Sequence, residues 1–349
     1  MSDYINHKEE RITIKDISEK IGVSTATISN VIHGKTKRVS KATIEKVQEA
    51  LEESGYIPNM AAVLLAQNSS RIVCVVLSDD KKYNGKMIED PFVSGIVNGI
   101  SKGLNQKGYF MMLKEEKDIS KIAQYASMWN MAGLILLGYC DSNYEELRRK
   151  IRIPLVVIDG YSKKVSNYGN VSIDNYDGGY KAGEYLIKNG HKNIMFLSDN
   201  DLCGDHQRYE GFKKALYDGG INHKLEDFKI LPMNKIQRDN YLNDIIKSIR
   251  SYTAVFCASD VYAIEFMNFL TDNNISVPDE ISIIGFDNIP ACEIVRPRLT
   301  TIEQNINKRA VCVCELLDSL IKKEDINNEK IISVKIIERD SVKKIGYDL

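Results

Sequence analysis

Several polar side chains, most of them carboxylates, come directly after short apolar runs in the second part of the chain. Such runs predict buried strands, and ligands of open α/β sheets lie outside the carboxyl ends of the strands. A carboxylate there accepts hydroxyl hydrogens, so the group suits a polyhydroxylated ligand. Each residue taken alone could equally cap the next helix or turn. The candidates are Ser78, Asp79, Asp80, Asp159, Asp199, Ser259, Asp260, Asp287 and Asn288.

Residue patterns for catalysis are weak. No glycine-rich phosphate loop follows an expected strand, and the five histidines are scattered without a Ser/His/Asp or Cys/His order. His191 lies in an expected helix-to-strand turn, which favours a structural role. Cys203 and His206 have the spacing of half a metal site, but the sequence offers no second half. We therefore expect no enzyme, no metal site and no cofactor.

A second kind of chemistry is indicated near the N-terminus. Small polar residues share the outward face of one expected helix: Thr25, Ala26, Ser29, Asn30 and His33. Such a face suits contact with base edges and phosphates. The loop that follows holds a basic cluster: Lys35, Lys37, Arg38 and Lys41. Because the whole chain has a net charge of −1, attraction to DNA phosphates must be local to this loop.

Three short helices are expected to position these residues. Thr13, with Asp16 in a capping box, begins the first helix, Ser24 begins the second and Ser40 the third. Apolar residues at helical spacing form the inward faces: Ile14, Ile17, Ile21, Ile28 with Val31 or Ile32, Ile44, Val47 and Leu51. The pattern predicts a helix-turn-helix domain over residues 11–57, although a generic helical bundle would share it.

From Arg71 onward, unbroken apolar runs alternate with longer amphipathic segments. This alternation predicts buried parallel strands in doubly wound α/β sheets. The units are too numerous for one sheet, so we expect two lobes with a break near residues 171–174. The expected strands are 72–77, 109–113, 134–137, 155–158, 193–197, 254–257 and 281–286, with a helix at 93–106.

Length and composition predict a cytoplasmic protein of two or three domains. At 349 residues the chain exceeds one compact core. Residues 1–10 form a polar extension without the pattern of a signal peptide, and no apolar run approaches the ~20 residues of a membrane span. Seven cysteines without CxxC pairs fit reduced thiols.

Residues 12–66 resemble the N-terminal signature of the LacI/GalR family of bacterial transcription regulators. The matching segments are IKDISEKIGVSTATISNVIHG, VSKAT and ALEESGYIPNMAAVLLA. The resemblance implies that a recognition helix enters the major groove of operator DNA. It implies base contacts from Thr25, Ala26 and Asn30, and phosphate contacts from Thr13, Ser24 and Tyr56.

The resemblance also implies a hinge helix within residues 58–70. Asn59 would cap this helix, and Leu65 would enter the minor groove as an apolar wedge. A plain linker is the alternative. The family usually has Arg-Ser/Gly-Leu where this chain has Val63–Leu65, so an arginine contact with DNA is lost.

A further departure lies in the recognition helix. The family commonly carries an arginine that reads guanine at the position of Asn30. Asparagine pairs best with adenine through N6 and N7. We therefore expect the half-site of this protein to favour A·T at the contacted position.

The rest of the chain, residues 71–349, resembles the effector domain of the family, which itself resembles type I periplasmic sugar-binding proteins. The matching segments are SIDNYDGGYKA, RYEGF, IGFDN, LTTI and ERDS. The resemblance implies that Arg208 and Asp287 contact the effector, with a surface ion pair as the alternative for Arg208. The expected effector-binding residues are Asp79, Phe92, Asp159, Arg208, Ser259, Asp260 and Asp287.

Three departures from the family pattern lie around the expected ligand site. Residues 80–90 are inserted, Asp159-Gly160 replaces a frequent Asp-Arg, and Asn305 replaces a proline. A particular sugar or purine therefore cannot be transferred from the family to this chain.

Chain order divides the effector domain into lobe one, residues 71–171 plus 303–330, and lobe two, residues 172–302 plus 331–349. The last strand is expected at 331–339 in lobe two. Three crossovers would form a hinge, so a ligand can change the lobe angle and with it the affinity for DNA. We expect a homodimeric repressor on a palindromic operator, controlled by a carbohydrate-like small molecule.

Other functions are compatible with parts of the sequence. A protein partner, such as a phosphorylated carrier protein, could replace the small molecule and leave the DNA function unchanged. A secreted or lipid-anchored sugar carrier would explain the α/β part, but it leaves residues 13–66 unexplained. A carbohydrate-acting enzyme would need turnover of a ligand.

Overall fold

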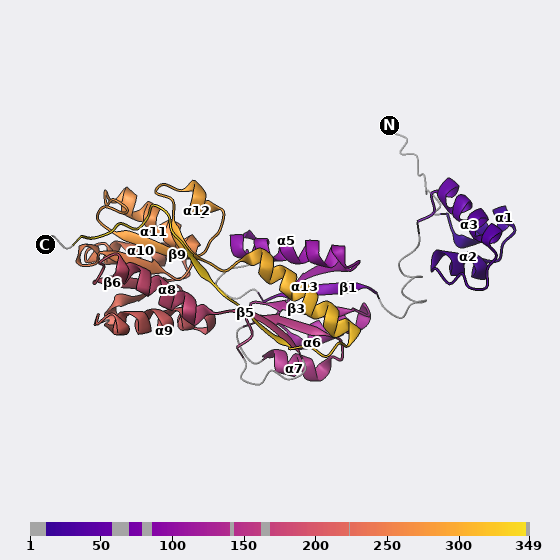
Figure 1. Ribbon diagram of the computed structural model, residues 1–349, viewed down its shortest axis with the longest axis horizontal. Coiled ribbons are helices and arrows are strands. Elements are labelled where there is room, and N and C mark those ends of the chain that lie inside the picture. The colour runs from indigo at the N-terminus through magenta and orange to yellow at the C-terminus, as the bar shows by residue number, and fades with distance from the viewer. Residues whose placement is uncertain are drawn as a thin grey trace, which may run out of the picture. The chain divides into compact units, whose positions relative to one another are not determined.

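The computed structural model describes residues 12–57, 70–78, 86–139, 143–161, 168–222 and 224–346 (Figure 1). The chain divides into two compact units, Met1–Asn68 and Ser69–Leu349. The expected hinge residues Asn59 and Leu65, and the expected effector residue Asp79, lie outside the described residues.

The N-terminal unit contains α1 (Ile14–Ile21), α2 (Thr25–Ile32) and α3 (Lys41–Ser54). One small core joins the three helices, and its buried members are Ile17, Ile28, Val31, Val47 and Ala50. Val31 rather than Ile32 is therefore the buried partner of Ile28. The expected three-helix arrangement is confirmed.

The helices of this unit begin at the expected caps. Thr13 Oγ1 accepts a hydrogen bond from the Asp16 amide at 3.3 Å, and the Asp16 carboxylate accepts one from the Thr13 amide at 2.7 Å. Ser24 and Ser40 each accept from an amide three residues later, at 3.2 Å. Gly22 ends α1 with a φ of +66°, a conformation that a side chain would strain.

The first sheet of the C-terminal unit has the strand order β11-β5-β4-β3-β1-β2, and its pairings are parallel. Its strands are β1 (Ile72–Leu77), β2 (Phe110–Glu115), β3 (Gly133–Leu137), β4 (Leu155–Ile158), β5 (Gly169–Ile173) and β11 (Glu329–Ile332). The helices that cover it are α5 (Pro91–Gln106), α6 (Ile119–Met128), α7 (Asn143–Lys150) and α13 (Ile306–Lys322).

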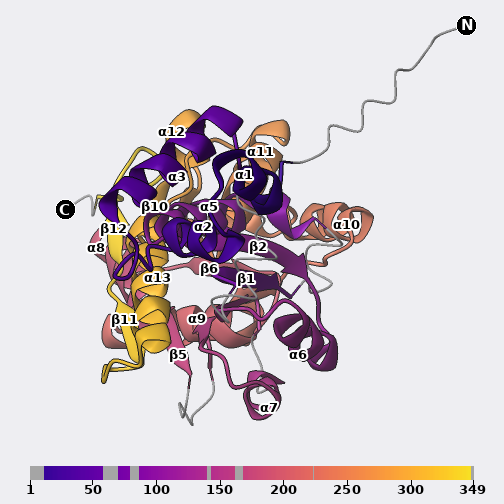
Figure 2. The same cartoon turned by 90° about the vertical axis from the view of Figure 1, so that its right-hand side faces the viewer.

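Alternate residues of β1 serve the two faces of this sheet. Val73, Val75 and Leu77 belong to the core that includes α5 and α13. Cys74 and Val76 belong to the core that includes α6 and α7. Figure 2 shows α6 and α7 on the side of the sheet away from α13. A side-chain period of two thus explains why an unbroken apolar run forms a strand that is covered on both faces.

The second sheet has the order β12-β10-β9-β8-β6-β7, in which β12 runs antiparallel to β10 and the other pairings are parallel. Its strands are β6 (Ile194–Ser198), β7 (Phe228–Ile230), β8 (Ala254–Cys257), β9 (Ser282–Asp287), β10 (Thr300–Glu303) and β12 (Lys335–Ile337). Its helices are α8 (Asn175–Lys188), α9 (Cys203–Asp218), α10 (Lys235–Ile245), α11 (Asp260–Asp272) and α12 (Ala291–Ile294). The expected two-lobed α/β fold is confirmed.

The chain passes between the two sheets after β5, after β10 and between β11 and β12. The single strand expected at 331–339 was wrong, because β11 pairs with β5 in the first sheet and β12 pairs with β10 in the second. Residues 333–334 belong to neither strand, and this break lets the chain change sheets. The whole of β5 lies in the first sheet, so lobe one extends to Ile173.

Helices α8 and α9 approach each other through glycines. A Cβ on Gly179 would lie 1.9 Å from the carbonyl oxygen of Arg208, and a Cβ on Gly211 would lie 1.9 Å from the carbonyl oxygen of Tyr176. Only glycine permits backbones to come this close. The pair of glycines therefore fixes the position of α9, and with it the position of the Arg208 side chain.

Candidate functional site

A cavity of about 250 Å³ lies at the carboxyl ends of strands from both sheets of the C-terminal unit. This is the place where open α/β sheets bind ligands. Its polar lining includes Asp90, Asp159, Asp205, Arg208, Asp287 and Gln304, and the apolar lining includes Phe92 and Met87. The cavity thus combines a few polar groups with apolar walls, which is typical of small-molecule sites.

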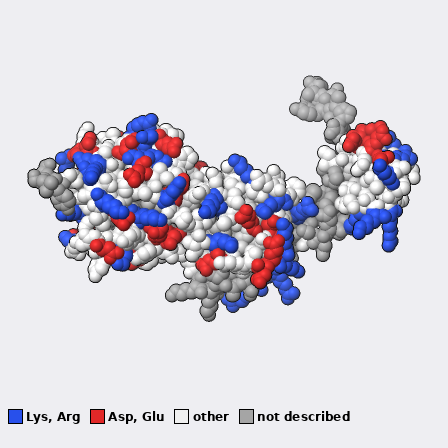
Figure 3. Space-filling view, viewed as in Figure 1, with Lys and Arg blue, Asp and Glu red and all other residues white. Residues whose placement is uncertain are grey.

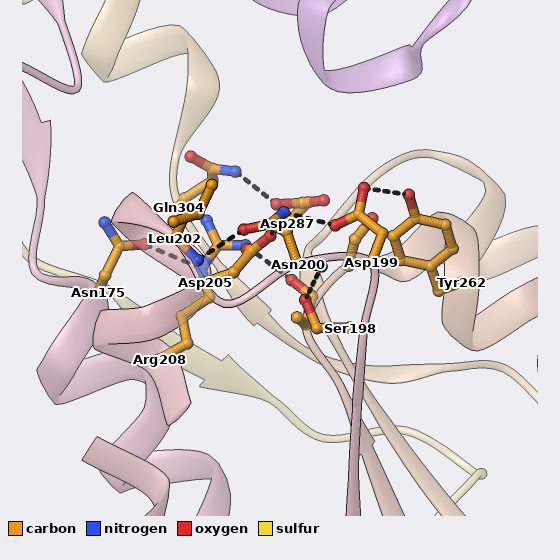
Figure 4. A network of polar contacts seen from close by, with 12 residues as sticks. Asn175, Ser198, Asp199, Asn200, Leu202, Asp205, Arg208, Tyr262, Asp287 and Gln304 are labelled. Atoms are coloured by element: carbon orange, nitrogen blue, oxygen red, sulfur yellow. Dashed lines mark hydrogen bonds and ion pairs between the residues drawn. The ribbon is translucent and has the colours of Figure 1, made fainter. Parts of the chain in front are cut away.

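Arg208, on α9, is the cation among the described residues that line this cavity, and it is held on several sides (Figure 4). Its Nε donates to Asn175 Oδ1 at 2.9 Å. Its Nη1 donates to Asp205 Oδ1 at 3.1 Å and to the carbonyl oxygen of Ala258 at 2.7 Å. The guanidinium also lies 3.8 Å from the centroid of the Phe286 ring. With a side chain only 13% exposed, Arg208 is fixed in orientation before any ligand arrives.

The surroundings of Arg208 keep it charged. Burial acts to lower the pKa of its guanidinium, but the surrounding acidic groups, of which Asp205 and Asp287 act most strongly, together outweigh burial and raise that pKa above its ordinary value. A buried cation with carboxylate neighbours is a rigid donor beside rigid acceptors. The site can therefore donate to one group of a ligand and accept from another.

Asp287 ends β9 and is held by the connection to α13. Its φ is +130°, and Gln304 Nε2 donates to its Oδ1 at 2.6 Å (Figure 4). The next residue, Asn288, donates from Nδ2 to Glu303 Oε1 at 3.0 Å and accepts from Arg339 Nη2 at 2.7 Å. These contacts fix the loop that presents the Asp287 carboxylate to the cavity.

Asp159 follows β4 on the other wall of the cavity. Its backbone is left-handed, with a φ of +57°, and its carboxylate forms an ion pair with Arg309 of α13. Arg309 is fully buried, donates from Nη1 to Gln304 Oε1 at 2.6 Å, and lies 5.5 Å from the centroid of the Phe92 ring. Asp159 is therefore one half of an ion pair rather than an isolated carboxylate.

The structure places five of the expected effector-binding residues around one cavity: Phe92, Asp159, Arg208, Ser259 and Asp287. Asp260 lies elsewhere and is a correction to our expectation. It is fully buried, where its Oδ1 accepts from Thr301 Oγ1 at 2.5 Å and its Oδ2 accepts from the Ile289 amide at 3.0 Å. Asp260 therefore supports the loop after β9 instead of facing the cavity.

The lining residues that were absent from the expected effector-binding set include Tyr161, Asn200, Asp205 and Gln304. Asn200 Nδ2 donates to Asp199 Oδ1 at 2.7 Å and to Asp205 Oδ2 at 2.8 Å. Tyr161 Oη accepts from Asn175 Nδ2 at 3.0 Å. The sequence positions of two of these residues could have indicated a place at the cavity. Asn200 directly follows the strand-end Asp199, and Asp205 precedes Arg208 by three residues on one helix face.

The insertion at 80–90 contributes to this wall where it is described. Residues 86–90 contain the short 3-10 turn Met87–Glu89, and Met87 is buried against the cavity. Asp90 caps α5, since its Oδ1 accepts from the amides of Phe92 and Val93 at 2.9 and 3.0 Å. Asp90 thereby fixes the backbone at Phe92, whose side chain lines the cavity.

In the N-terminal unit, the outward face of α2 is accessible. Thr25, Ala26 and Asn30 are exposed, and Ser29 and His33 are half-buried. Thr13 and Ser24 are exposed, but both hydroxyls are engaged in their helix caps. Tyr56 packs partly against the small core. The side chains expected to face bases thus form a small, uncharged surface.

Charge is unevenly distributed over this unit. Asn30 lines the same hollow as Lys35, Lys37 and Arg38, which follow α2. Figure 3 shows acidic atoms gathered at one end of the unit and a group of basic atoms at the opposite end. The basic loop beside α2 therefore provides the local positive charge that contact with phosphates needs.

Comparison with known proteins identifies the family. The profile described as "Bacterial regulatory proteins, lacI family" matches residues 13–59, and a "Periplasmic binding protein-like domain" matches residues 184–342. The HTH-type transcriptional regulator MalR of Clostridium butyricum is 32% identical over 345 residues, which cover 95% of this chain and 99% of that protein. The chain belongs to the LacI family of bacterial regulatory proteins. It is accordingly a DNA-binding transcription regulator, and α1, α2 and α3 form its DNA-binding domain.

Further relatives agree with this assignment. The HTH-type transcriptional repressor PurR of Vibrio parahaemolyticus is 32% identical over 347 residues, 96% of this chain and 99% of that protein. The lac repressor dimer bound to operator and the anti-inducer ONPF has the same fold, with a TM-score of 0.84 at 22% identity over 96% of this chain and all of that one. A LacI family regulator from Enterococcus faecium with bound ribose has a TM-score of 0.67 at 28% identity over 78% of this chain and all of that one.

Two kinds of feature are absent from the described residues. No helix among them is long and apolar enough to cross a membrane. No group of three or more His, Cys, Asp and Glu side chains in the same part of the chain could hold a metal ion.

Proposed function

We propose that this LacI-family regulator is a repressor that binds a palindromic operator as a homodimer and releases or tightens its hold when a sugar-like effector occupies the cavity. The observation that carries the proposal is the placement of Arg208, Asp159 and Asp287 around one cavity at the strand ends of both lobes. A ligand that bridges these groups binds one lobe angle better than another. Only such differential binding can shift a conformational equilibrium.

The charge of the cavity supports a neutral ligand. Among the described lining residues, four carboxylates face one guanidinium: Asp90, Asp159, Asp205 and Asp287 against Arg208. A phosphorylated ligand would meet repulsion from most of these groups, whereas hydroxyls can donate to carboxylates and accept from Arg208. We therefore infer an uncharged polyhydroxylated effector. Ribose is bound by the Enterococcus faecium relative and cellobiose by the related regulator CelR, which makes both rational first probes.

The effector controls DNA through linkage between two sites. Three chain crossovers connect the lobes, so a change in lobe angle can reach the N-terminal end of the unit at residue 70. Linkage is reciprocal, which means that the effector changes operator affinity by the factor with which the operator changes effector affinity. Both factors can be measured on the same protein, and the proposal requires them to be equal.

For the DNA contacts, we propose that Thr25, Ala26 and Asn30 face base edges with Ser29 and His33 beside them, and that Thr13, Ser24 and Tyr56 contact phosphates. The exposure of the first three supports this assignment. Asn59 and Leu65 complete the proposal as cap and minor-groove wedge of the hinge helix. The dimer places two recognition helices about one turn of DNA apart, on the two halves of a palindrome.

Calorimetry with matched sugar pairs tests the effector proposal. Full-length protein is titrated with D-ribose and ribose 5-phosphate, with D-glucose and glucose 6-phosphate, and with cellobiose and maltose. We expect at least one uncharged sugar to bind and its phosphorylated partner to bind much more weakly. Arg208→Ala should abolish the heat of binding, while Arg298→Ala, on the surface ion pair with Asp340, should not.

Gel retardation tests the DNA arm of the same proposal. The operator is first selected from a random DNA pool, and its retardation is then measured with and without the sugar that bound. We expect the sugar to change operator affinity by at least fivefold. Tight operator binding combined with sugar-insensitive affinity would instead point to a protein partner as the regulator. Turnover of any sugar in the titration would instead support the alternative that the protein is a carbohydrate-acting enzyme.

We also infer that the protein acts in the cytoplasm and is not an enzyme. Membership of a family of transcription regulators supports both inferences, since such a regulator works on chromosomal DNA.

A further inference from the structure

Four side chains form a continuous polar chain from one wall of the cavity to the other. Asp159, after β4, is paired with Arg309 of α13. Arg309 Nη1 donates to Gln304 Oε1 at 2.6 Å, and Gln304 Nε2 donates to Asp287 Oδ1 at 2.6 Å. Arg309, Gln304 and Asp287 are all buried. We name the chain Asp159–Arg309–Gln304–Asp287 the buried relay.

The relay connects the two lobes. Asp159 follows the first sheet, and Asp287 ends a strand of the second. Arg309 sits on α13, which packs against α5 and the first sheet, while Gln304 lies in the crossover between β10 and α13. The relay therefore passes through one of the segments about which the lobes can move.

Gln304 can satisfy both of its neighbours in one orientation only. The Arg309 guanidinium has donors and no acceptor, so it requires the amide oxygen of Gln304. The ionised Asp287 carboxylate has acceptors and no donor, so it requires the amide nitrogen. Rotating the amide by half a turn would break both hydrogen bonds together. The hydrogen bond of Gln304 to Arg309 and its hydrogen bond to Asp287 therefore form and break together.

The first link of the relay has hydrogen-bonding capacity to spare. Among the buried side-chain atoms of the described residues, those without a hydrogen-bond partner are Asp159 Oδ1, Arg309 Nε and Arg309 Nη2. A side-on pair with two parallel hydrogen bonds would use these three atoms together with Asp159 Oδ2. Arg309 Nη2 already lies in the ion pair with Asp159 Oδ2, so this fork would add the contact between Arg309 Nε and Asp159 Oδ1. Any ligand contact that turns Asp159 is therefore felt at Arg309.

We propose that Arg309 is a positioning residue that makes Asp159 and Asp287, the carboxylates of the two cavity walls, respond as one unit. Arg309 holds Asp159 directly and holds Asp287 through Gln304. A contact made at one wall then alters the acceptor offered at the other wall. This coupling is a property of the ligand-free protein. Its test can therefore fail or succeed independently of the proposed sugar effector.

A double-mutant cycle in two backgrounds tests the coupling. Asp159→Asn, Asp287→Asn and the double variant are made in the full-length protein and again in an Arg309→Met background. Urea unfolding is followed by the fluorescence of Trp129, the single tryptophan of the chain, which ends α6 in the C-terminal unit and is half exposed. The signal thus reports on the unit that contains the relay.

With Arg309 present, we expect the effect of the double variant on the folding equilibrium constant to depart at least threefold from the product of the single effects. With Met at 309, the effects should multiply to within about twofold. Direct repulsion between the two carboxylates would survive the loss of Arg309, so the second background separates the two causes. A residue with only a structural role would lower stability without changing this departure.

Two further variants complete the design. Gln304→Met leaves the Asp159–Arg309 pair intact and cuts the link to Asp287, so it should also remove the departure, and it replaces Arg309→Met if that variant does not fold. Asp340→Asn, on the exposed Arg298 pair of lobe two, should combine with Asp159→Asn multiplicatively in every background. The proposal is overturned if the Asp159 and Asp287 effects multiply in the wild-type background. It is equally overturned if their departure persists unchanged with Met at 304.

Discussion

The Arg208 guanidinium lies over the ring of Phe286, 3.8 Å from the ring centroid. Phe286 directly precedes Asp287 in the sequence. Phe286 is fully buried in β9, and Arg208 comes from α9. The two therefore meet only when α9 is seated on the second sheet. The contact between Arg208 and Phe286 thus positions the Arg208 guanidinium against β9, the strand that also carries the Asp287 carboxylate.

Arg208→Lys should weaken binding of the effector by about 3 kcal/mol, roughly 100-fold. Lysine keeps the charge, but its single ammonium cannot bond Asn175, Asp205 and the Ala258 carbonyl while stacking on a ring. Calorimetry with the sugar that binds the wild type measures the loss. Arg298→Lys serves as the control, since Arg298 pairs with Asp340 on the surface. Equal affinities for wild type and Arg208→Lys would remove Arg208 from the proposed site.

Gly211→Ala should destabilise the C-terminal unit by about 2 to 3 kcal/mol and displace α9. The new Cβ would lie 1.9 Å from the backbone oxygen of Tyr176, which cannot move without moving α8. Urea unfolding followed by Trp129 fluorescence gives the change in free energy. Gly95→Ala in α5 is the matched control, because its Cβ would meet the Ile306 side chain at an ordinary 3.5 Å. A mild effect of Gly211→Ala would show that the two helices can separate at little cost.

His191 should make the stability of the C-terminal unit pH-dependent. It is buried, with Nδ1 bonded to Thr253 Oγ1 at 3.0 Å and Nε2 to the Lys343 carbonyl at 3.1 Å. Burial lowers the pKa of His191 below its ordinary value of 6.5. Between the folded pKa and 6.5 the unfolded chain therefore binds more protons than the folded one, and stability falls as pH falls through this window.

The expected slope from this one group is at most about 1.4 kcal/mol per pH unit below pH 6.5. Urea midpoints at pH 5.5 and 7.5 measure it, and His191→Gln supplies the comparison without a titrating ring. The wild type should lose more stability than the variant between these two pH values. Parallel losses would mean that His191 has the same pKa in the folded and the unfolded chain, and that it is therefore not buried in solution.

Asn30→Arg should switch the preferred half-site from A·T to G·C at the contacted position. Arginine donates to guanine O6 and N7, whereas asparagine pairs with adenine, and each such pair discriminates by about 1 to 3 kcal/mol. Selection from a random DNA pool with both proteins reads out the preference. Gln48→Arg adds the same charge at an exposed position of α3 and should leave the selected sequence unchanged. If the wild type already selects guanine there, the proposed role of Asn30 is wrong.

Elements held by local chemistry could be predicted from the sequence closely. Ser24 and Ser40 cap helices because a hydroxyl bonds an amide three residues later, whatever the rest of the fold does. Strands such as β1 and β8 were expected at their observed bounds, since runs covered on both faces are apolar throughout. Strands β5 and β7 were not expected, because Gly169–Ile173 contains polar residues and Phe228–Ile230 is only three residues long.

The cavity residues show where local reasoning ends. Asp159 and Asp260 both follow strands, yet Asp159 lines the cavity while Asp260, at the start of α11, bonds the loop after β9. The backbone conformation after each strand determines whether the carboxylate points into the cavity. The neighbouring residues in the sequence do not predict that conformation. Arg309 did have a signal, because Arg309, Val313 and Leu316 recur on the buried face of α13. A cation on an apolar face requires a buried partner, and only the folded chain shows that this partner is Asp159.

The interrupted final strand has a consequence for how the protein is made. β11 completes the edge of the first sheet and β12 the edge of the second, and Ser341 Oγ then bonds both the Ile283 carbonyl and the Thr300 amide. During synthesis on the ribosome, neither lobe can reach its final form until β11, β12 and Ser341 emerge from the exit tunnel. A chain released before Glu329 would therefore contain two unfinished lobes rather than one finished lobe.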